Sequence, residues 1–231
     1  MIRIFATRVP DAVEAIGRAA LLSATAPARG ARLRRIRNER ARERAAVADL
    51  LARWALGEFL HVDSRELHLA RDSRGRPFLP GAARTHLSLT HSGEWAACAV
   101  GRAPLGIDVE REIPLEIDAM ARILSPEEAR DLSQRPRSER LRRFYELWTL
   151  KESYVKAVGL GWKIPPDSFT ISIGPDGGIA VHGQNARRGY HWRQYRLARE
   201  YPTAVCAREE VTRSSIGFVR PSRLREFARA M

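Results

Sequence analysis

The chain has 231 residues, of which 44% are hydrophobic and 29% charged, and 40 Lys and Arg against 27 Asp and Glu give it a formal net charge of +13. This composition excludes a disordered chain and is sufficient for a sizeable hydrophobic core. The two cysteines exclude a disulfide scaffold, and no apolar run is long enough for a signal peptide or a membrane-spanning helix, so we expect a soluble cytoplasmic protein.

The excess of positive charge predicts an anionic partner: nucleic acid, a membrane, a phosphorylated ligand or an acidic protein. Eight arginines fall between Arg29 and Arg44. A general abundance of arginine explains the overall excess equally well, so charge alone does not select a function.

The first half of the chain, residues 1–104, is predicted to form a helix followed by strands. Apolar residues recur at helical spacing at Val47, Leu50, Leu51 and Trp54, which predicts a helix over about residues 32–59. The elements expected after it are a strand, a turn and the two strands of a hairpin, at 66–70, 72–75, 85–90 and 95–100.

The second half, residues 105–231, opens with the strand LGIDVE at 105–110. Ser125 as N-cap, Pro126 and Glu128 then predict a helix N-terminus with a capping box. A long helix is expected over 138–158, ending at Gly159. Four strands should follow, at 169–173, 178–182, 192–197 and 203–207. We therefore predict an α+β fold of two similar halves, each a long helix packed on a small antiparallel sheet, with the active site in the cleft between them.

Two carboxylates in the LGIDVE strand suggest a cation site. Asp108 and Glu110 are two residues apart, so they share one face of the strand with Cα atoms about 6.5–7 Å apart. Carboxylate oxygens suit Mg²⁺, which keeps several waters and shares its shell with phosphate oxygens. An acidic, solvent-facing edge is the alternative. Glu152 and Lys156, which share one face of the long helix, favour a metal–phosphate site over an ordinary helix ion pair.

The residues GIDVE at 106–110, followed about forty residues later by WTLKESYVKAVGLG at 148–161, resemble the 4'-phosphopantetheinyl transferase superfamily. Length and motif order resemble its surfactin-type, single-chain branch. The resemblance covers the chain from Arg29 to about Ala207. It implies a Mg²⁺-dependent enzyme that carries the phosphopantetheine arm of coenzyme A onto a serine of an apo acyl or peptidyl carrier protein and releases 3',5'-ADP.

The resemblance also implies roles for the acidic and basic residues of the two motifs. Asp108, Glu110 and Glu152 would hold Mg²⁺ against the coenzyme A pyrophosphate. Lys156 would contact the phosphates and assist the departure of 3',5'-ADP. The chemistry of the transfer itself requires a base for the serine proton, and Glu152 is the best-placed candidate, directly or through a bound water. Glu128 is a second candidate, although its capping-box role is the simpler account.

Other residues implied by the resemblance lie in the first half. The segment LSLTHS at 87–92 corresponds to the family's turn motif, in which Thr90 and His91 would meet the phosphates. Ser88 and Thr90 replace the usual Asn and Ser there. Arg76, in the Gly-Arg-Pro element at 75–77, would lie beside the adenine nucleotide. Candidates for binding the 3'-phosphate are Arg29, Arg32 and Arg44.

Two alternative functions would explain parts of the sequence. A nucleic-acid-binding protein would explain the arginines at 29–44 but leaves the three carboxylates unexplained. A transferase-like scaffold without activity would not need intact Asp108, Glu110, Glu152 and Lys156. We expect a monomer with one coenzyme A per chain and with neither nucleic acid nor membrane as a partner. The carrier protein stays open, whether from fatty-acid, polyketide or nonribosomal-peptide synthesis.

Overall fold

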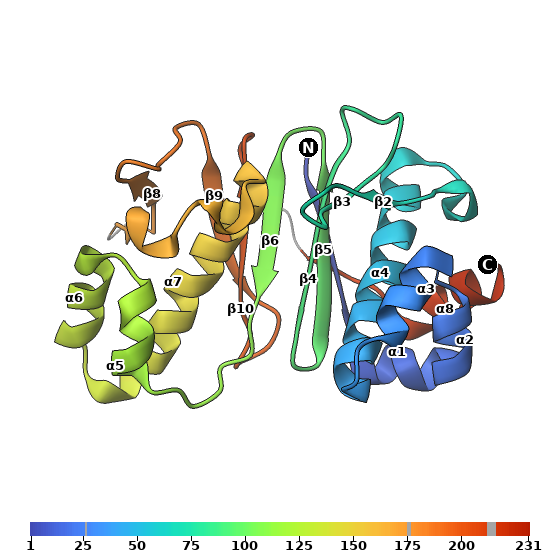
Figure 1. Ribbon diagram of the computed structural model, residues 1–231, viewed down its shortest axis with the longest axis horizontal. Coiled ribbons are helices and arrows are strands. Elements are labelled where there is room, and N and C mark those ends of the chain that lie inside the picture. Colours follow the sequence, from blue (N-terminus) through green and yellow to red (C-terminus); the bar gives the residue numbers. More distant parts are fainter. Residues whose placement is uncertain (26, 175–176, 212–215) are drawn as a thin grey trace. The chain divides into compact units, whose positions relative to one another are not determined.

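The computed structural model describes residues 1–25, 27–174, 177–211 and 216–231, and within these ranges no helix is both long and apolar enough to cross a membrane. The chain divides into two compact units (Figure 1). Unit 1 contains residues 1–102 and the described C-terminal residues 216–231, and unit 2 contains residues 103–211. Both units combine helices with small sheets, so the predicted α+β fold is confirmed.

Unit 1 is built on a mixed sheet with the strand order β11-β1-β5-β4. Its 22-residue helix α4 packs on β4, β5 and β1 and buries Val47, Leu50 and Leu51 completely. A separate two-stranded sheet joins β2 to β3. The elements of unit 1 are β1 (Arg3–Arg8), α1 (Val9–Ile16), α2 (Arg18–Ser23), α3 (Pro27–Arg34), α4 (Glu39–Leu60), the 3₁₀ turn η1 (Ser64–Glu66), β2 (Ala70–Arg71), β3 (Pro77–Phe78), β4 (His86–Ser92), β5 (Trp95–Gly101), β11 (Gly217–Phe218) and α8 (Pro221–Arg229).

Two sequence predictions in unit 1 are wrong. The helix expected over about 32–59 is two helices, because Asn38 caps a new N-terminus and its side chain accepts a hydrogen bond from the backbone N–H of Ala41 at 2.9 Å. The strand expected at 66–70 is the turn η1 followed by the short strand β2. The hairpin is confirmed as β4 and β5, with Gly93 at φ 53° in its turn.

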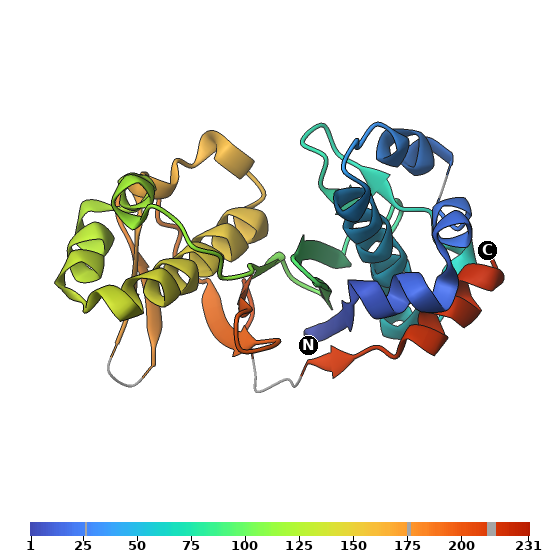
Figure 2. The same ribbon diagram turned by 90° about the horizontal axis from the view of Figure 1, so that it is seen from below.

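The described C-terminal residues 216–231 pack on unit 1, whereas the sequence predicts a second half that contains all of 105–231. β11 runs parallel to β1, with Gly217 opposite Phe5. Helix α8 packs against α1 and α4, and Figure 2 shows it side by side with α1. Its one fully buried residue, Leu224, belongs to the core of this unit.

Unit 2 has an antiparallel sheet with the strand order β6-β10-β9, covered by the 22-residue helix α7. Phe144, Leu147 and Leu150 on α7 form the core with Ala204 and Cys206 on β10. The elements of unit 2 are β6 (Leu105–Val109), α5 (Ile117–Met120), α6 (Pro126–Gln134), α7 (Arg137–Val158), β7 (Thr170–Ile173), β8 (Ile179–His182), β9 (His191–Arg196), β10 (Pro202–Ala207) and the 3₁₀ turns η2 (Ala121–Ile123), η3 (Gly161–Lys163) and η4 (Pro166–Ser168).

The helix signals read from the second half are confirmed. The Ser125 side chain and the Glu128 side chain form the reciprocal capping box of α6. Gly159 ends α7 in the left-handed conformation, at φ 75°.

Candidate active site

Strand β6 approaches helix α7 more closely at Gly106 than a side chain would allow. A Cβ on Gly106 would lie 2.1 Å from the carbonyl oxygen of Ser153 and 2.6 Å from the backbone nitrogen of Ala157. Asp108 lies two residues along the strand, so it projects from the same face of β6 as Gly106, toward α7. The glycine of the GIDVE motif thus brings the Asp108 carboxylate within reach of the helix.

Asp108 and Lys156 form an ion pair between β6 and α7. The Lys156 ammonium donates a hydrogen bond to Oδ1 of Asp108 at 2.6 Å and one to the carbonyl oxygen of Ile107 at 3.2 Å. The Asp108 side chain is 4% exposed and that of Lys156 30% exposed. A carboxylate with so little access to water needs a paired cation, and the Lys156 side chain supplies one while remaining partly exposed.

The other two predicted carboxylates act on the same ammonium. Burial lowers the pKa of Lys156, but the charge and hydrogen bond of Asp108 outweigh it, so the pKa is raised. The charges of Glu152 and Glu110 raise it further. Glu152 has its own pKa raised by burial, against the opposing charge of Lys156, and the charge of Asp108 raises it again. The structure therefore brings together the four residues expected at the metal–phosphate site.

The residues around Lys156 match Mg²⁺ in chemistry. Three carboxylates against one ammonium leave two formal negative charges, which one divalent cation would balance, and all three offer the oxygen ligands that Mg²⁺ prefers. With Lys156 on Asp108, however, no group of three or more His, Cys, Asp or Glu in the described ranges is arranged to hold a metal ion.

Glu128, the second candidate base, makes structural contacts, which agree with its predicted capping-box role. Its Oε2 accepts from the backbone N–H of Ser125 at 2.8 Å, and Oε1 accepts from that of Ile171 at 2.7 Å. It also pairs with Lys151 at 2.8 Å, and both side chains are 1% exposed. The Lys151 ammonium donates to the carbonyl oxygens of Pro166 and Phe169, at 2.6 Å each. These buried hydrogen bonds and the Glu128–Lys151 ion pair join α6 and α7 to β7 and the segment before it.

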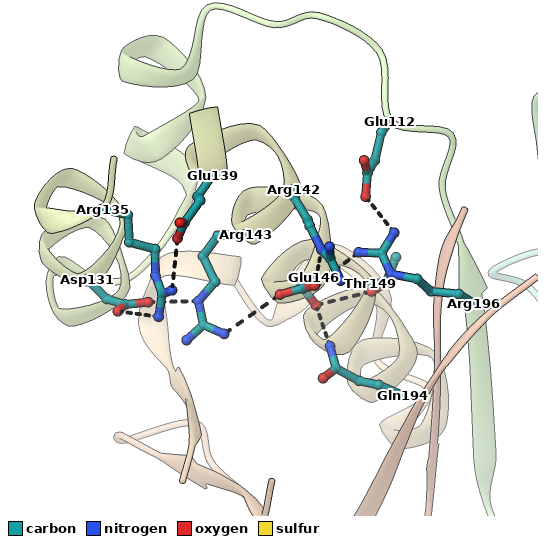
Figure 3. Close-up of polar contacts among 10 residues, drawn as sticks. All are labelled: Glu112, Asp131, Arg135, Glu139, Arg142, Arg143, Glu146, Thr149, Gln194 and Arg196. Atoms are coloured by element: carbon teal, nitrogen blue, oxygen red, sulfur yellow. Dashed lines mark hydrogen bonds and ion pairs between the residues drawn. The ribbon is translucent and has the colours of Figure 1, made fainter. Parts of the chain in front are cut away.

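A charged network fixes the chain after Glu110 to the same helix (Figure 3). Arg196 on β9 donates to Glu112 at 2.9 Å and to Glu146 on α7 at 3.0 Å. The hydroxyl of Tyr145 bonds both backbone groups of Ile113. The network extends along α6 and α7 through the ion pairs of Asp131 with Arg135 and Arg143, of Glu139 with Arg135, and of Glu146 with Arg142 and Arg143.

In unit 1 the Gly-Arg-Pro element forms a tight turn at the edge of a pocket. Oδ1 of Asp72 accepts from the backbone N–H of Arg76 at 2.9 Å, and Gly75 has φ 80°. Arg76 lines a pocket of about 390 Å³ whose other lining is largely apolar. The remaining lining residues are Asp72, Pro77, Phe78, Leu79, Ala82, Ala83, Thr85, His86 and Leu87.

Thr90 lies in strand β4, as predicted, whereas His91 lies in the same strand and not in the turn of the hairpin where it was expected. Successive strand residues point to opposite faces. Thr90 is 6% exposed and shares its face with the buried Ser88, whereas His91 is exposed on the other face.

The arginine-rich segment contributes to a cluster of ion pairs of which the sequence predicts only a part. Arg29 on α3 pairs with the buried Asp49 of α4, and Arg71 of β2, which was not predicted, pairs with the same carboxylate. Arg32 is exposed on α3, and its charge acts on Arg71. Within the described part of the chain, Arg44 makes no ion pair with Asp49. An acid inside the apolar run AAVADLLA was the available signal for this cluster.

Comparison with known proteins identifies the family of the chain. The model of the 4'-phosphopantetheinyl transferase superfamily matches residues 104–206. A 4'-phosphopantetheinyl transferase of Bacillus subtilis is 31% identical over 187 residues, which cover 81% of this chain and 84% of that protein. The 4'-phosphopantetheinyl transferase Sfp of Bacillus subtilis strain 168 is 28% identical over 186 residues, covering 80% and 83%.

A more distant solved structure is that of Thermotoga maritima holo-[acyl-carrier-protein] synthase, at 22% identity and a TM-score of 0.36, over 46% of this chain and 62% of that one. It is too remote to inform the site. The sequence relatives suffice: the chain belongs to the 4'-phosphopantetheinyl transferase superfamily, a class of group-transfer enzymes. The resemblance carried by GIDVE and WTLKESYVKAVGLG is confirmed.

Proposed function

We propose that this protein transfers the 4'-phosphopantetheine arm of coenzyme A to a serine hydroxyl of an apo acyl or peptidyl carrier protein, with Mg²⁺, and releases 3',5'-ADP. One observation carries the proposal. The Lys156 ammonium is paired with Asp108 at 2.6 Å, and the charges of Glu152 and Glu110 raise its pKa. Such a group of acids and one cation suits a pyrophosphate bound through a metal ion.

Phosphoryl transfer needs positioning and charge neutralisation more than covalent chemistry from the protein. Asp108, Glu110 and Glu152 would hold Mg²⁺, which when bound polarises the pyrophosphate and neutralises its charge. The Lys156 ammonium stabilises the negative charge on the departing 3',5'-ADP. Glu152 accepts the proton of the carrier serine, directly or through a water, and burial raises its pKa toward the range that suits a general base.

We assign the nucleotide end of coenzyme A to residues of unit 1. The largely apolar pocket beside Arg76 fits a flat purine base, with the guanidinium at its edge to meet phosphate oxygens. Thr90 and His91 contact the phosphates, and Arg29, Arg32 and Arg44 remain our candidates for the 3'-phosphate.

We further propose that the two units are related halves that serve one coenzyme A per chain, and that the protein acts as a monomer. Each unit has a helix of 22 residues packed on a sheet, which supports the idea of related halves. The net charge of +13 favours an acidic carrier domain, since complementary charge speeds encounter and orients the partners. Neither nucleic acid nor a membrane is part of the proposal.

Mass spectrometry of intact carrier proteins tests the proposal. A panel of apo acyl and peptidyl carrier proteins is incubated with the protein, coenzyme A and Mg²⁺. At least one carrier should gain the mass of a single phosphopantetheine arm, and its serine-to-alanine variant should gain nothing. If no carrier in a broad panel is modified while the protein binds duplex or single-stranded nucleic acid tightly at physiological salt, the transferase proposal is wrong.

A further inference from the structure

One of the three site carboxylates lies just beyond the end of its strand. Strand β6 ends at Val109, so Glu110 is the first residue of the segment 110–116, which is neither helix nor strand. Asp108 differs, because it lies within the ladder of β6 and β10, opposite Ala204. A side chain on an irregular segment keeps a precise position only if other contacts hold the segment.

Backbone hydrogen bonds hold this segment to β10. The N–H of Glu110 donates to the carbonyl oxygen of Pro202 at 3.2 Å, and the N–H of Glu112 donates to that of Glu200 at 2.8 Å. These bonds keep the segment beside the sheet. They do not connect it to α7, the helix that carries Glu152.

The side chain of Arg196, on β9, makes that connection. Its Nη1 donates to Oε1 of Glu112 at 2.9 Å and its Nη2 to Oε1 of Glu146 on α7 at 3.0 Å, as Figure 3 shows. Nη1 also donates to the carbonyl oxygen of Arg199 at 2.7 Å, which fixes the guanidinium in place. A guanidinium is a rigid planar fork, so it fixes the two acids relative to one another as a flexible ammonium could not.

Glu110 is therefore bracketed by two connections to α7. Two residues before it, Asp108 is paired with Lys156 at 2.6 Å. Two residues after it, Glu112 is joined to the helix through Arg196. The carboxylate beyond the end of the strand is thus held from both sides.

Glu152 lies between the same two connections on the helix. Glu146 and Lys156 are ten residues apart, which is about 15 Å along a helix, and Glu152 lies between them. The segment and the helix are thus joined at two points, with Glu110 on one element and Glu152 on the other. Loss of either connection frees one end of this arrangement.

We propose that Arg196 is a positioning residue of the transfer site, which joins Glu112 to Glu146 and so holds Glu110 where it can bind the same Mg²⁺ as Glu152. The inference rests on the proposed function for the identity of the metal ion. It assigns a role in metal binding to a residue that does not itself offer a ligand, and it makes the ion pairs of Arg196 more than a contribution to stability.

Binding of Mn²⁺ to the full chain with coenzyme A, without carrier, tests the inference. Mn²⁺ prefers the same oxygen ligands as Mg²⁺, and electron paramagnetic resonance measures its free concentration. Arg196→Met should weaken binding of Mn²⁺ at least about tenfold, as is typical when a residue that orients a metal ligand is lost. Removal of a positive charge would by itself strengthen binding of a cation. A loss of affinity therefore reports the position of the ligands and not the change in charge.

Arg143→Met is the matched control. Arg143 also pairs with Glu146, at 4.0 Å, and with Asp131 at 2.8 Å, so its ion pairs join α7 to α6. The variant removes the same charge and a similar number of ion pairs, and it should bind Mn²⁺ as tightly as the wild type. An equal loss of affinity in Arg143→Met would show general loosening of α7 and overturn the inference.

Arg196→Lys keeps the charge but loses the planar fork, so it should weaken binding of Mn²⁺ by a smaller factor than Arg196→Met. If Arg196→Met does not fold, as judged by circular dichroism, Arg196→Lys decides by the same criterion. Carrier modification by a wild type whose Arg196→Met variant binds Mn²⁺ as tightly as the wild type, or more tightly, would overturn this inference alone. A wild type that neither binds Mn²⁺ with coenzyme A nor modifies a carrier would overturn the proposed function and the inference with it.

Discussion

Gly106 on β6 lies so close to Ser153 on α7 that a Cβ on the glycine would come within 2.1 Å of the serine carbonyl oxygen. Backbone cannot yield as a flexible side chain can, so any larger residue must push the strand and the helix apart. Asp108 on the strand and Lys156 on the helix are joined at 2.6 Å, and their contact depends on that spacing.

Gly106→Ala should therefore move Asp108 on β6 away from Lys156 on α7. We expect transfer activity to fall at least about tenfold and the protein to lose about 1–3 kcal/mol of stability, as is typical of overpacking. Steady-state rates and thermal melts measure the two effects. Gly217→Ala in β11 is the control, because its added atom would meet the Phe5 ring at 3.2 Å and no backbone closer than 3.5 Å. Wild-type activity in Gly106→Ala would refute the link between spacing and function.

Asp108→Ala and Glu152→Ala should each remove nearly all transfer activity and leave the fold intact. Both acids lie at the Lys156 ammonium, and the proposed metal would lose a ligand in either variant. Loss of one electrostatic contact of this kind costs about a hundredfold to a thousandfold in turnover. Carrier modification rates, with circular dichroism as the check on folding, give the answer. Near wild-type turnover in Mg²⁺ for either variant would show that the metal assignment is wrong.

Lys156→Met should reduce turnover strongly, and Lys156→Arg should reduce it less. The arginine keeps the charge beside Asp108 but not the compact ammonium, so its contacts with the carboxylate and the Ile107 carbonyl change. The turnover numbers of the two variants, compared at saturating coenzyme A, measure the difference. Equal activity of Lys156→Met and the wild type would rule out a role for the ammonium in leaving-group departure.

Arg76→Ala should mainly raise the KM for coenzyme A and leave kcat close to the wild-type value. The residue lines the pocket in unit 1. Contacts with the nucleotide end of coenzyme A stabilise the ground state and the transition state about equally, so their loss weakens binding without slowing the chemical step. Initial rates over a range of coenzyme A concentrations separate the two constants. A fall in kcat with an unchanged KM would place Arg76 at the reacting phosphate instead.

Local rules predict that the four site residues of unit 2 form two pairs, and the family resemblance predicts that the two pairs meet. Strand alternation places Asp108 and Glu110 on one face, helix periodicity does the same for Glu152 and Lys156, and the structure brings the two elements together. The sequence does not reveal that Lys156 forms a direct ion pair with Asp108. That contact depends on the approach of β6 to α7, which is a property of tertiary packing.

The arginine cluster shows the limit of pattern reading. The run of charged residues before α4 has no apolar period that would mark the break at Asn38, so one helix was expected where two occur. The pairing of Asp49 with Arg71 joins residues far apart in the chain, and periodicity cannot predict such a contact. The signal that led to Asp108, an acid in an apolar run, was also present at Asp49.

The salt dependence of carrier modification should reflect the charge of the protein. A net charge of +13 attracts an acidic carrier, and screening weakens that attraction, since the Debye length falls from about 10 Å at 0.1 M salt to about 3 Å at 1 M. The KM for the carrier should rise with salt more steeply than kcat falls. Constant kinetics from low to high salt would show that charge does not guide the encounter.

The mass of an apo carrier after incubation with this protein and coenzyme A, with Mg²⁺ or with an excess of chelator, tests the central claim most directly. We expect the carrier to gain one phosphopantetheine arm on its serine in Mg²⁺, no gain in chelator, and recovery when Mg²⁺ is added back. Full modification in chelator would contradict the claim that Asp108, Glu110 and Glu152 form a metal site. The absence of modification across a broad carrier panel in Mg²⁺ would contradict the claim that this site transfers the arm.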